Sequence, residues 1–244
     1  MRLGALLLLC MINASWAFSQ SVDIENYALE ETATPLGGFF LFGLVTGFPD
    51  AQFKEAMDSN FGGPSLGFTT SFGFNPYGSR RESPLLLGLD FTYHSFGRDQ
   101  TTDPITSVLY KTSFNHYFVG PLARLYPVRK DKLIPFLEAT AGLSILNTRI
   151  KTNEFDDSGE TFVLDSESDK GFGYSIGFGF HTNRVKEDLE QLRASFFMKL
   201  LYSWGDRSSY VKRDSVSVVD DVYSYETGYT STNMLQVQVG VLFY

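Results

Sequence analysis

The chain has almost no cysteine, and beyond its first twenty residues it has no long apolar run. Its single cysteine, Cys10, lies inside an apolar stretch from Leu3 to Ile12. If that stretch is removed, disulfides, thiolate metal sites and a cysteine nucleophile are all excluded. No later apolar run approaches the roughly 20 residues that a membrane helix needs. Stability is therefore expected to come from a sheet or from contact with lipid.

The N-terminal stretch has the features of a secretory signal peptide. Arg2 precedes the apolar run, and small residues follow it in the patterns Ser15-Trp16-Ala17 and Ala17-Phe18-Ser19. We predict a signal peptide over residues 1–19, with cleavage after Ser19 or, as second choice, after Ala17. Residues 20–36 would then form a short periplasmic segment, and residues 37–244 the folded domain.

Basic residues are too few to suggest a nucleic acid partner. The chain has 20 Lys and Arg against 28 Asp and Glu, and loss of Arg2 with the signal peptide changes the net charge from −8 to −9. Phosphate backbones are bound by an excess of positive charge, and the sequence shows no basic stripe that would supply one. Nucleic acid is therefore excluded as an expected partner.

The remainder repeats stretches of about ten residues in which apolar and polar side chains alternate. In residues 171–183, Phe172, Ile176 and Phe178 alternate with Gly173, Ser175 and other small or polar residues. The same pattern recurs in residues 65–75, 85–96, 137–145, 194–204 and 234–244. Residues 37–48 and 109–126 are less regular, since both of their faces are apolar for part of their length, and their registers stay open. Eight such strands predict an all-β fold, an eight-stranded antiparallel up-and-down transmembrane β-barrel.

Connections of two lengths alternate along the chain. Short ones at residues 77–84, 127–132 and 183–191 take turns with long ones at 49–63, 98–107, 151–170 and 205–231. Short turns on one side and long loops on the other are typical of barrels in the outer membrane. We therefore predict a location in the cell outer membrane, with both chain ends on the periplasmic side and the long loops outside.

The polarity of the two strand faces separates this prediction from a soluble barrel of the lipocalin kind. A soluble barrel places bulky apolar groups inside and polar groups outside. Here one face carries Gly, Ser, Thr and isolated charges, which suits a narrow lumen filled by its own side chains. The bulky face suits lipid, and barrel closure pairs every backbone group as lipid demands.

Two segments carry a family resemblance. The stretch Phe118-Val-Gly120-Pro121-Leu-Ala-Arg124-Leu-Tyr126, followed by Ile134-Pro135-Phe136-Leu-Glu138, resembles the small outer-membrane barrel proteins of Bacteroidota. This resemblance implies a barrel similar in shape to the OmpA and OmpX transmembrane domains, with Arg124 facing the lumen. The terminal Phe243 and Tyr244 are similar to the signal recognised by the barrel insertion machinery, which is an expected partner. Only Phe243 shares parity with the lipid-facing valines, so which aromatic serves as the signal stays open.

Charged residues at inward positions are the most informative group. A charge facing lipid near the bilayer midplane would cost roughly 2–4 kcal/mol, so these residues belong inside, where each needs a partner. We predict a lumen charge network that plugs the barrel and fixes its register, with a gated ion path as the alternative. The network comprises Asp90, His94, Arg124, Glu138 and Lys199.

No catalytic, cofactor or metal site is predicted. Gly173-Tyr174-Ser175-Ile176-Gly177 matches the G-x-S-x-G nucleophile motif, but that motif needs a sharp strand-to-helix turn, and here it lies within an alternating strand. His94, His116 and His181 lack the i, i+2 or i, i+4 spacing of metal ligands. The glycines are expected to leave room for larger side chains from facing strands.

The expected role is structural, or interaction through the extracellular loops. The acidic loop 151–170 and the tyrosine-rich loop 205–231 together form a hypothetical surface for an extracellular partner. Outer-membrane lipid and lipopolysaccharide are further expected partners. Two alternatives remain open at this stage: a lipid-active, deacylase-like enzyme with a histidine, a serine and an acid near the outer rim, and a narrow channel.

Overall fold

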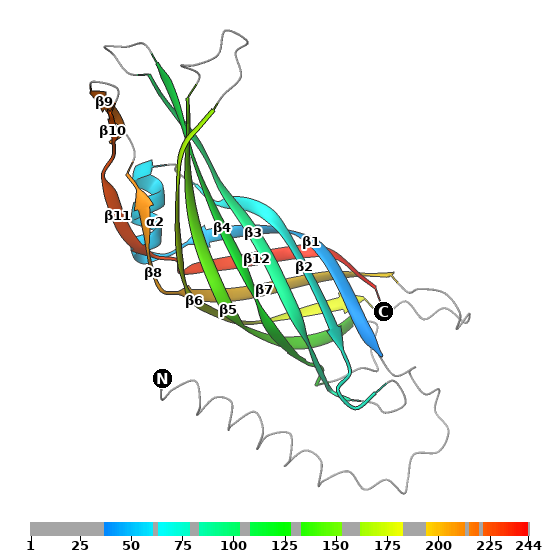
Figure 1. The fold of residues 1–244 in the computed structure, drawn as a ribbon. Helices are drawn as coiled ribbons and strands as arrows, with labels where there is room; N and C mark the ends of the chain where they lie inside the picture. Colours follow the sequence, from blue (N-terminus) through cyan, green and yellow to red (C-terminus); the bar gives the residue numbers. More distant parts are fainter. Residues whose placement is uncertain are drawn as a thin grey trace, which may run out of the picture. The chain divides into compact units, whose positions relative to one another are not determined.

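Eight antiparallel strands close into a barrel in the computed structural model (Figure 1). The structure describes residues 37–60, 63–78, 83–102, 108–127, 133–152, 162–182, 194–212, 215–219 and 222–243. The predicted signal peptide (1–19), the segment 20–36 and Tyr244 lie outside them. The barrel strands, in chain order, are β1 (Gly38–Pro49), β2 (Ser65–Phe74), β3 (Leu85–Thr102), β4 (Leu109–Leu125), β5 (Leu133–Thr152), β6 (Phe162–Thr182), β7 (Ala194–Gly205) and β12 (Met234–Phe243). The predicted fold class is confirmed.

The last strand closes the barrel against the first, as its alternating sequence predicts. Val241 lies opposite Phe42 and Leu235 opposite Phe48, and the other side of β12 pairs with β7. The rings of Phe40 and Phe243 stack across this seam with centroids 6.3 Å apart. Where all eight strands pair, closure leaves no free sheet edge, so the backbone groups there bond to one another.

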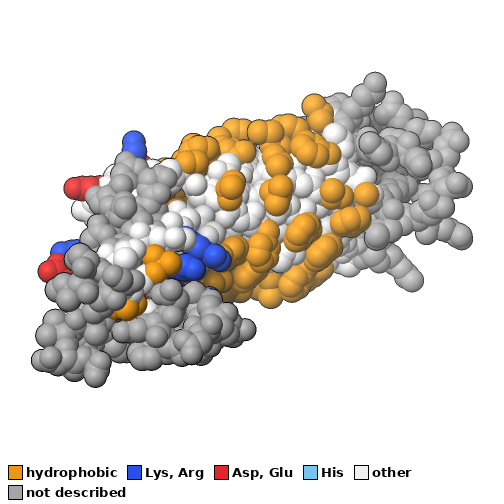
Figure 2. All heavy atoms as spheres, turned by 90° about the horizontal axis from the view of Figure 1, so that it is seen from above, with side chains coloured by type: hydrophobic (Ala, Val, Ile, Leu, Met, Phe, Trp, Pro, Cys, Tyr) orange, Lys and Arg blue, Asp and Glu red, His pale blue; other side chains and the backbone are white. Residues whose placement is uncertain are grey.

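The two faces of the wall have opposite character, and the bulky one is outside. Leu66, Leu44 and Phe178 expose 70%, 66% and 59% of their surface, whereas inward neighbours such as Leu41, Thr69 and Ser175 are buried. Figure 2 shows the exposed apolar side chains as a belt around the visible side of the barrel. The predicted orientation of the faces is confirmed.

The registers that the sequence left open are now assigned. Phe39, Leu41 and Val45 of β1 point inward, and Phe40, Phe42 and Leu44 point outward. In β4, Phe118 and Leu122 are buried inside while Val119 and Leu125 are exposed. Both faces are apolar here because Phe39, Leu41 and Leu122 form an apolar layer at the short-turn end of the lumen. The other members of this layer include Leu86, Phe136, Phe197 and Leu242.

Four neighbouring strands are much longer than a membrane crossing needs. β3, β4, β5 and β6 have 18, 17, 20 and 21 residues, against about 9–11 for a transmembrane strand. Their far ends extend beyond the closed part of the barrel (Figure 1), and we call them the protruding sheet. Part of the predicted loop 151–170 is therefore strand. From Asp165 to Asp169 both faces of β6 are polar, so hydrophobic alternation could not reveal it.

The region predicted as loop 205–231 is built mainly from short hairpins. β8 (Arg207–Val211) pairs with β11 (Thr227–Ser231), and β9 (Ser217–Val219) pairs with β10 (Val222–Ser224). The tyrosine-rich loop is thus mostly paired strand. The β1–β2 connection holds a helix, α2 (Ala51–Asn60), which the sequence did not predict. Within the described residues, no helix has the length and apolar character needed to cross a bilayer.

Candidate functional site

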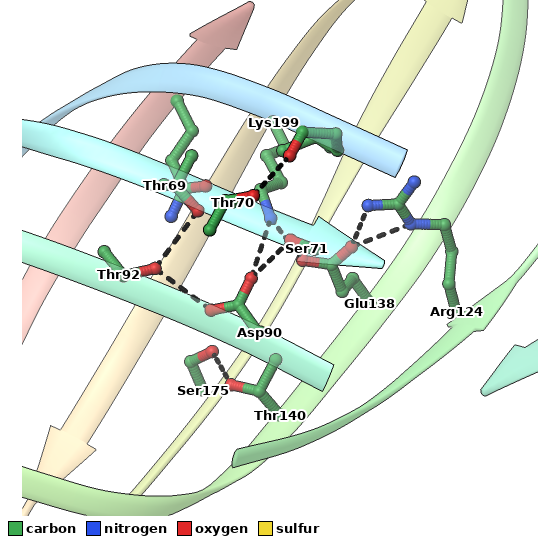
Figure 3. A network of polar contacts seen from close by, with 12 residues as sticks. Thr69, Thr70, Ser71, Asp90, Thr92, Arg124, Glu138, Thr140, Ser175 and Lys199 are labelled. Carbon is green, nitrogen blue, oxygen red and sulfur yellow. Dashed lines mark hydrogen bonds and ion pairs between the residues drawn. The ribbon is translucent and has the colours of Figure 1, made fainter. Parts of the chain in front are cut away.

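Four charged side chains from four strands meet inside the barrel (Figure 3). Glu138 of β5 accepts hydrogen bonds at Oε2 from Arg124 Nε at 2.8 Å and Nη2 at 2.5 Å, and at Oε1 from Lys199 Nζ at 2.5 Å. Lys199 Nζ also lies 3.8 Å from Asp90 Oδ1. All four residues are buried, and two cations balance two anions. Glu138 is the centre of the cluster because it contacts both cations.

Asp90 is held at the margin of this cluster by hydroxyl groups. Ser71 Oγ donates to Asp90 Oδ1 at 2.6 Å, and Thr92 Oγ1 donates to Oδ2 at 3.0 Å. Thr69 continues the chain, with its hydroxyl 3.2 Å from that of Thr92 (Figure 3). Each oxygen of this buried carboxylate therefore has a donor, as burial of a charge requires.

Two aromatic rings enclose the Arg124 guanidinium. Its central carbon lies 4.2 Å from the ring centroid of Phe39 and 4.3 Å from that of Phe136. A delocalised planar cation stacks on aromatic faces more favourably than an ammonium group does. Arg124 thus joins the charged layer to the apolar layer at the short-turn end.

The strand register explains why these residues can meet. Arg124 and Glu138 are direct cross-strand neighbours on β4 and β5. β6 separates Glu138 from Lys199, and its inward positions opposite them are Gly177 and Gly179. A Cβ at Gly179 would lie 2.6 Å from Phe136 Cζ and 2.7 Å from Lys199 Cβ. These glycines give the long side chains the space to cross the lumen.

His94 does not join the charge network to which it was assigned. It shares the inward face of β3 with Asp90, but the four-residue separation places it roughly 13 Å further along the strand. There His94 Nδ1 lies 2.8 Å from Ser65 Oγ, and His116 Nε2 lies 2.8 Å from Ser144 Oγ. The two imidazole rings are 5.9 Å apart, so they form a second polar layer above the charges.

The remaining histidine lies at the opposite end of the lumen. His181 packs edge-on against Tyr126 with ring centroids 5.6 Å apart, and against Phe136 at 6.4 Å. The three histidines are therefore distributed over two levels. Among the described residues, no group of three or more His, Cys, Asp or Glu side chains is arranged to hold a metal ion.

A small cavity lies beside the polar layers. Asp90, His116, Ser144, Ser175 and Gln238 are among the residues that line it, and its volume is about 10 Å³. That is about the space for one water molecule. A cavity of this size is too small for a hydrated ion.

Helix α2 covers the long-loop end of the lumen. Phe53, Ala56 and Met57 are buried on one side of the helix and form an apolar cluster with residues of the barrel and of β8. Phe53 packs edge-on against Phe96, with ring centroids 5.0 Å apart. The i, i+3, i+4 spacing of 53, 56 and 57 is the signal that could have revealed this helix.

The order of the layers follows from the order of residues on one strand. From the short-turn end, the inward positions of β3 include Leu86, Asp90, His94 and Phe96. They belong in turn to the apolar layer, the charged layer, the histidine layer and the cap of α2. The lumen is thus filled from end to end by side chains of contrasting polarity.

Comparison with known proteins gives only distant structural likeness. No family model matches the chain, and no curated protein does. A major outer membrane protein from Thermus thermophilus is 8% identical with a TM-score of 0.47, covering 86% of this chain and 100% of that one. The attachment invasion locus protein Ail of Yersinia pestis, solved with the heparin analogue sucrose octasulfate, is 12% identical with a TM-score of 0.41 (84% and 95%). Outer membrane protein W of E. coli is 14% identical with a TM-score of 0.38 (86% and 98%). These structures are small outer-membrane β-barrels.

Proposed function

We propose that the protein is a non-enzymatic, non-conducting barrel of the bacterial outer membrane that supports an extracellular interaction surface. The observation that carries this proposal is the combination of a bulky apolar belt outside with a filled polar lumen inside. In water, an exposed belt containing Leu66, Leu44 and Phe178 would be an aggregation hazard. In a bilayer the same surface contacts acyl chains, and the closed sheet satisfies the backbone.

Aromatic residues mark the end of the belt next to the protruding sheet. The rings of Tyr93 and Tyr117 lie 5.1 Å apart, and those of Tyr174 and Trp204 are also 5.1 Å apart. These outward rings lie where the closed barrel gives way to the protruding sheet, the position of an interfacial aromatic girdle. Since outer-membrane barrels have short periplasmic turns and longer extracellular loops, the protruding sheet would stand outside the cell and the short turns would face the periplasm.

The protruding sheet and the β8–β11 hairpin form one supported unit. Ser209 N donates to Asp169 Oδ2 at 2.6 Å, and the Tyr225 hydroxyl donates to Asp165 Oδ2 at 2.8 Å. Val211 packs with Val108, Tyr110 and Ile150 in a separate apolar cluster. A surface held in this way suits binding, because little conformational entropy is lost when a partner binds.

The enzymatic alternative lacks an accessible histidine, because all three histidines of the chain are buried. Ser65 and His94 do lie within hydrogen-bond reach, yet both are fully buried in the lumen. The nearest inward carboxylate along β3, Asp90, is bound by hydroxyls and by Lys199. A lipid-active site would need these groups to meet at a surface that faces the outer leaflet.

The location can be tested by cysteine labelling in a Cys10→Ser background. Tyr229 on β11 and Tyr77 beside the β2–β3 turn expose 59% and 56% of their surface. A membrane-impermeant maleimide should label Tyr229→Cys on intact cells and Tyr77→Cys only after the outer membrane is permeabilised. Equal labelling of both on intact cells would contradict the proposed orientation and location.

The non-conducting, non-enzymatic role needs two measurements on the purified protein. In planar bilayers we expect no unit conductance, because the lumen is filled; steady conductance steps would support the channel instead. Incubated with outer-membrane lipids, the protein should release no acyl chains. Release that disappears in Ser65→Ala would establish the enzyme.

A further inference from the structure

One face of the protruding sheet collects cations that are dispersed in the sequence. The register places Arg98 of β3 opposite Ser113 of β4, Ser113 opposite Arg149 of β5, and Arg149 opposite Ser166 of β6. These four residues form one row across the outward side. The sequence shows no basic stripe because each strand contributes only one or two of the cations.

Neighbouring rows extend the same face. Lys111 and Lys151 are direct partners one row further out, and Lys170 lies opposite Ile145 at the start of the protruding sheet. We call Arg98, Lys111, Arg149, Lys151 and Lys170 the basic face. At the outward positions that the structure describes in this part of β3–β6, the other residues are neutral, and none carries a carboxylate.

The acidic residues of β6 occupy the alternate positions, on the opposite side of the sheet. Asp165 accepts a hydrogen bond from Tyr225, and both Glu167 and Asp169 accept from Ser209. Their charges are thus directed toward the β8–β11 hairpin. The period-2 alternation separates charge by sign, although the whole chain is acidic.

A β-bulge sets the position of Arg98. The β3–β4 register shifts by one residue between Ser95 and Arg98, next to Gly97, whose φ is +106°. Before the bulge the even-numbered residues of β3 face inward; after it, Arg98 stands opposite the outward Ser113 and Asp99 opposite Thr112. Without the extra residue, Arg98 would stand opposite Thr112, at an inward position. Bulges commonly redirect a side chain in this way.

The basic face begins at the aromatic girdle. Ile145, the partner of Lys170, is also the partner of Tyr117. Arg149 is four residues further along β5, which corresponds to roughly 13 Å of strand. The cations therefore begin at the edge of the apolar belt and extend outward from it, beyond the roughly 5–7 Å that a headgroup layer adds on each side of the hydrocarbon core. Figure 2 shows basic side chains beside this edge on the visible side of the barrel.

We infer that the basic face binds the phosphate groups of an anionic glycolipid in the outer leaflet. The inference rests on the proposed outer-membrane location. Arginine forks bind phosphate in bidentate fashion, and lysines add unspecific positive charge. Continuity with the apolar belt favours a lipid over a soluble polyanion, because acyl chains against Phe172 and Tyr117 would bring the headgroup to the cations.

The test compares phosphorylated with enzymatically dephosphorylated lipid A, added to the mature protein in a neutral detergent. We expect tighter binding of the phosphorylated form, weakened by salt. The double variant Arg98→Gln/Arg149→Gln should lower the affinity of the protein for phosphorylated lipid A about 25-fold. This is about fivefold for each cation, the factor that corresponds to about 1 kcal/mol per cation near an anionic surface. Lys54→Gln/Lys212→Gln removes two cations outside the basic face and should leave the affinity unchanged.

Three results would overturn the inference. They are equal binding of both lipid A forms, an equal loss of affinity in both double variants, and binding of a sulfated oligosaccharide with no preference between the lipids. Insertion into neutral phosphatidylcholine vesicles, followed by circular dichroism, is measured in parallel. A protein that inserts but shows no phosphate preference refutes the glycolipid site and leaves the proposed barrel function standing; failure to insert counts against the barrel function itself.

Discussion

Along β6, the outward positions carry Phe178, Ile176 and Tyr174 in the closed barrel, but Ser168 and Ser166 in the protruding sheet. The inward positions change as well, from Ser175 and its neighbouring glycines to Asp169, Glu167 and Asp165. The alternation of side chains is the same in both segments. What differs is the environment of the outward face, which is apolar where lipid is proposed and polar beyond it.

The charged side chains are also placed differently in the two regions. In the closed barrel the charges lie inside and sum to zero, because neither lipid nor a dry lumen tolerates an unpaired ion. In the protruding sheet, charges of opposite sign occupy opposite faces, and water or a headgroup layer can solvate each face. Variants that move or unpair a charge should therefore have large effects in one region and small effects in the other.

Glu138→Gln should have the largest effect. It leaves Arg124 and Lys199 buried without the carboxylate that each contacts at 2.5 Å. Breaking a buried ion pair by removing one partner costs about 3–5 kcal/mol. The free energy of unfolding, measured by urea titration in lipid vesicles, should fall by that amount. Lys199→Met tests the plug from the other side, and little loss of thermal stability in detergent would count against it.

The matched control is an exposed ion pair. Lys212 and Glu226 lie 3.1 Å apart, with side chains 49% and 72% exposed. Such pairs contribute about 0–1 kcal/mol. Glu226→Gln should therefore be nearly neutral, and an equal loss in both variants would show that burial does not distinguish the two regions.

Phe178→Arg should have the next largest effect. Phe178 is an outward belt residue that exposes 59% of its surface, and an arginine near the midplane of the bilayer costs about 2–4 kcal/mol. Ser166→Arg places the same side chain at an exposed outward position of the same strand, beyond the belt; it removes the hydrogen bond that Ser166 Oγ accepts from Asn147 and should cost no more than about 1 kcal/mol. Unfolding in vesicles measures both. Similar stability of the two variants would contradict the assignment of the belt to lipid.

Much of the closed barrel could be predicted from sequence because period-2 alternation reports directly which face a residue occupies. It does not report at which level of the lumen side chains from different strands meet. His94 and Asp90 share a face four residues apart, so their different layers follow from spacing along one strand, whereas the level at which residues from different strands meet depends on register and strand tilt. The pairing of Glu138 with Lys199 across β6 is set in the same way.

The protruding sheet was harder to predict because both of its faces are polar. Hydrophobic alternation ends near Lys170, so the strand beyond it resembled an acidic loop. The basic face depends on pairing across four strands and on a bulge at Gly97, neither of which a single sequence displays. Helix α2 left a local signal in the spacing of Phe53, Ala56 and Met57.

Met57→Ala should loosen the cap without unfolding the barrel. Met57 exposes 1% of its surface and belongs to the cluster that joins α2 to the barrel mouth. Truncation of a buried methionine costs about 2 kcal/mol at the low end of its range, which suits a site at the end of the lumen. Hydrogen exchange should quicken in residues 51–60 and remain slow in β4 and β5. Uniform acceleration would mean that the cap and the barrel unfold together.

Tyr225→Phe should have the smallest effect, confined to the hairpin region. The Tyr225 hydroxyl donates to Asp165 Oδ2 at 2.8 Å in a partly buried position, and the loss of such a bond costs about 1 kcal/mol or somewhat more when the acceptor is charged. Hydrogen exchange should accelerate about fivefold in β8 and β11, with the barrel strands unchanged. Tyr229→Phe is the control, because Tyr229 is 59% exposed and its ring packs beneath Arg207, a contact that phenylalanine retains. If both variants loosen the hairpin equally, the contact with Asp165 does not hold it to the sheet, and the acidic side of β6 would be as open to solvent as the basic face.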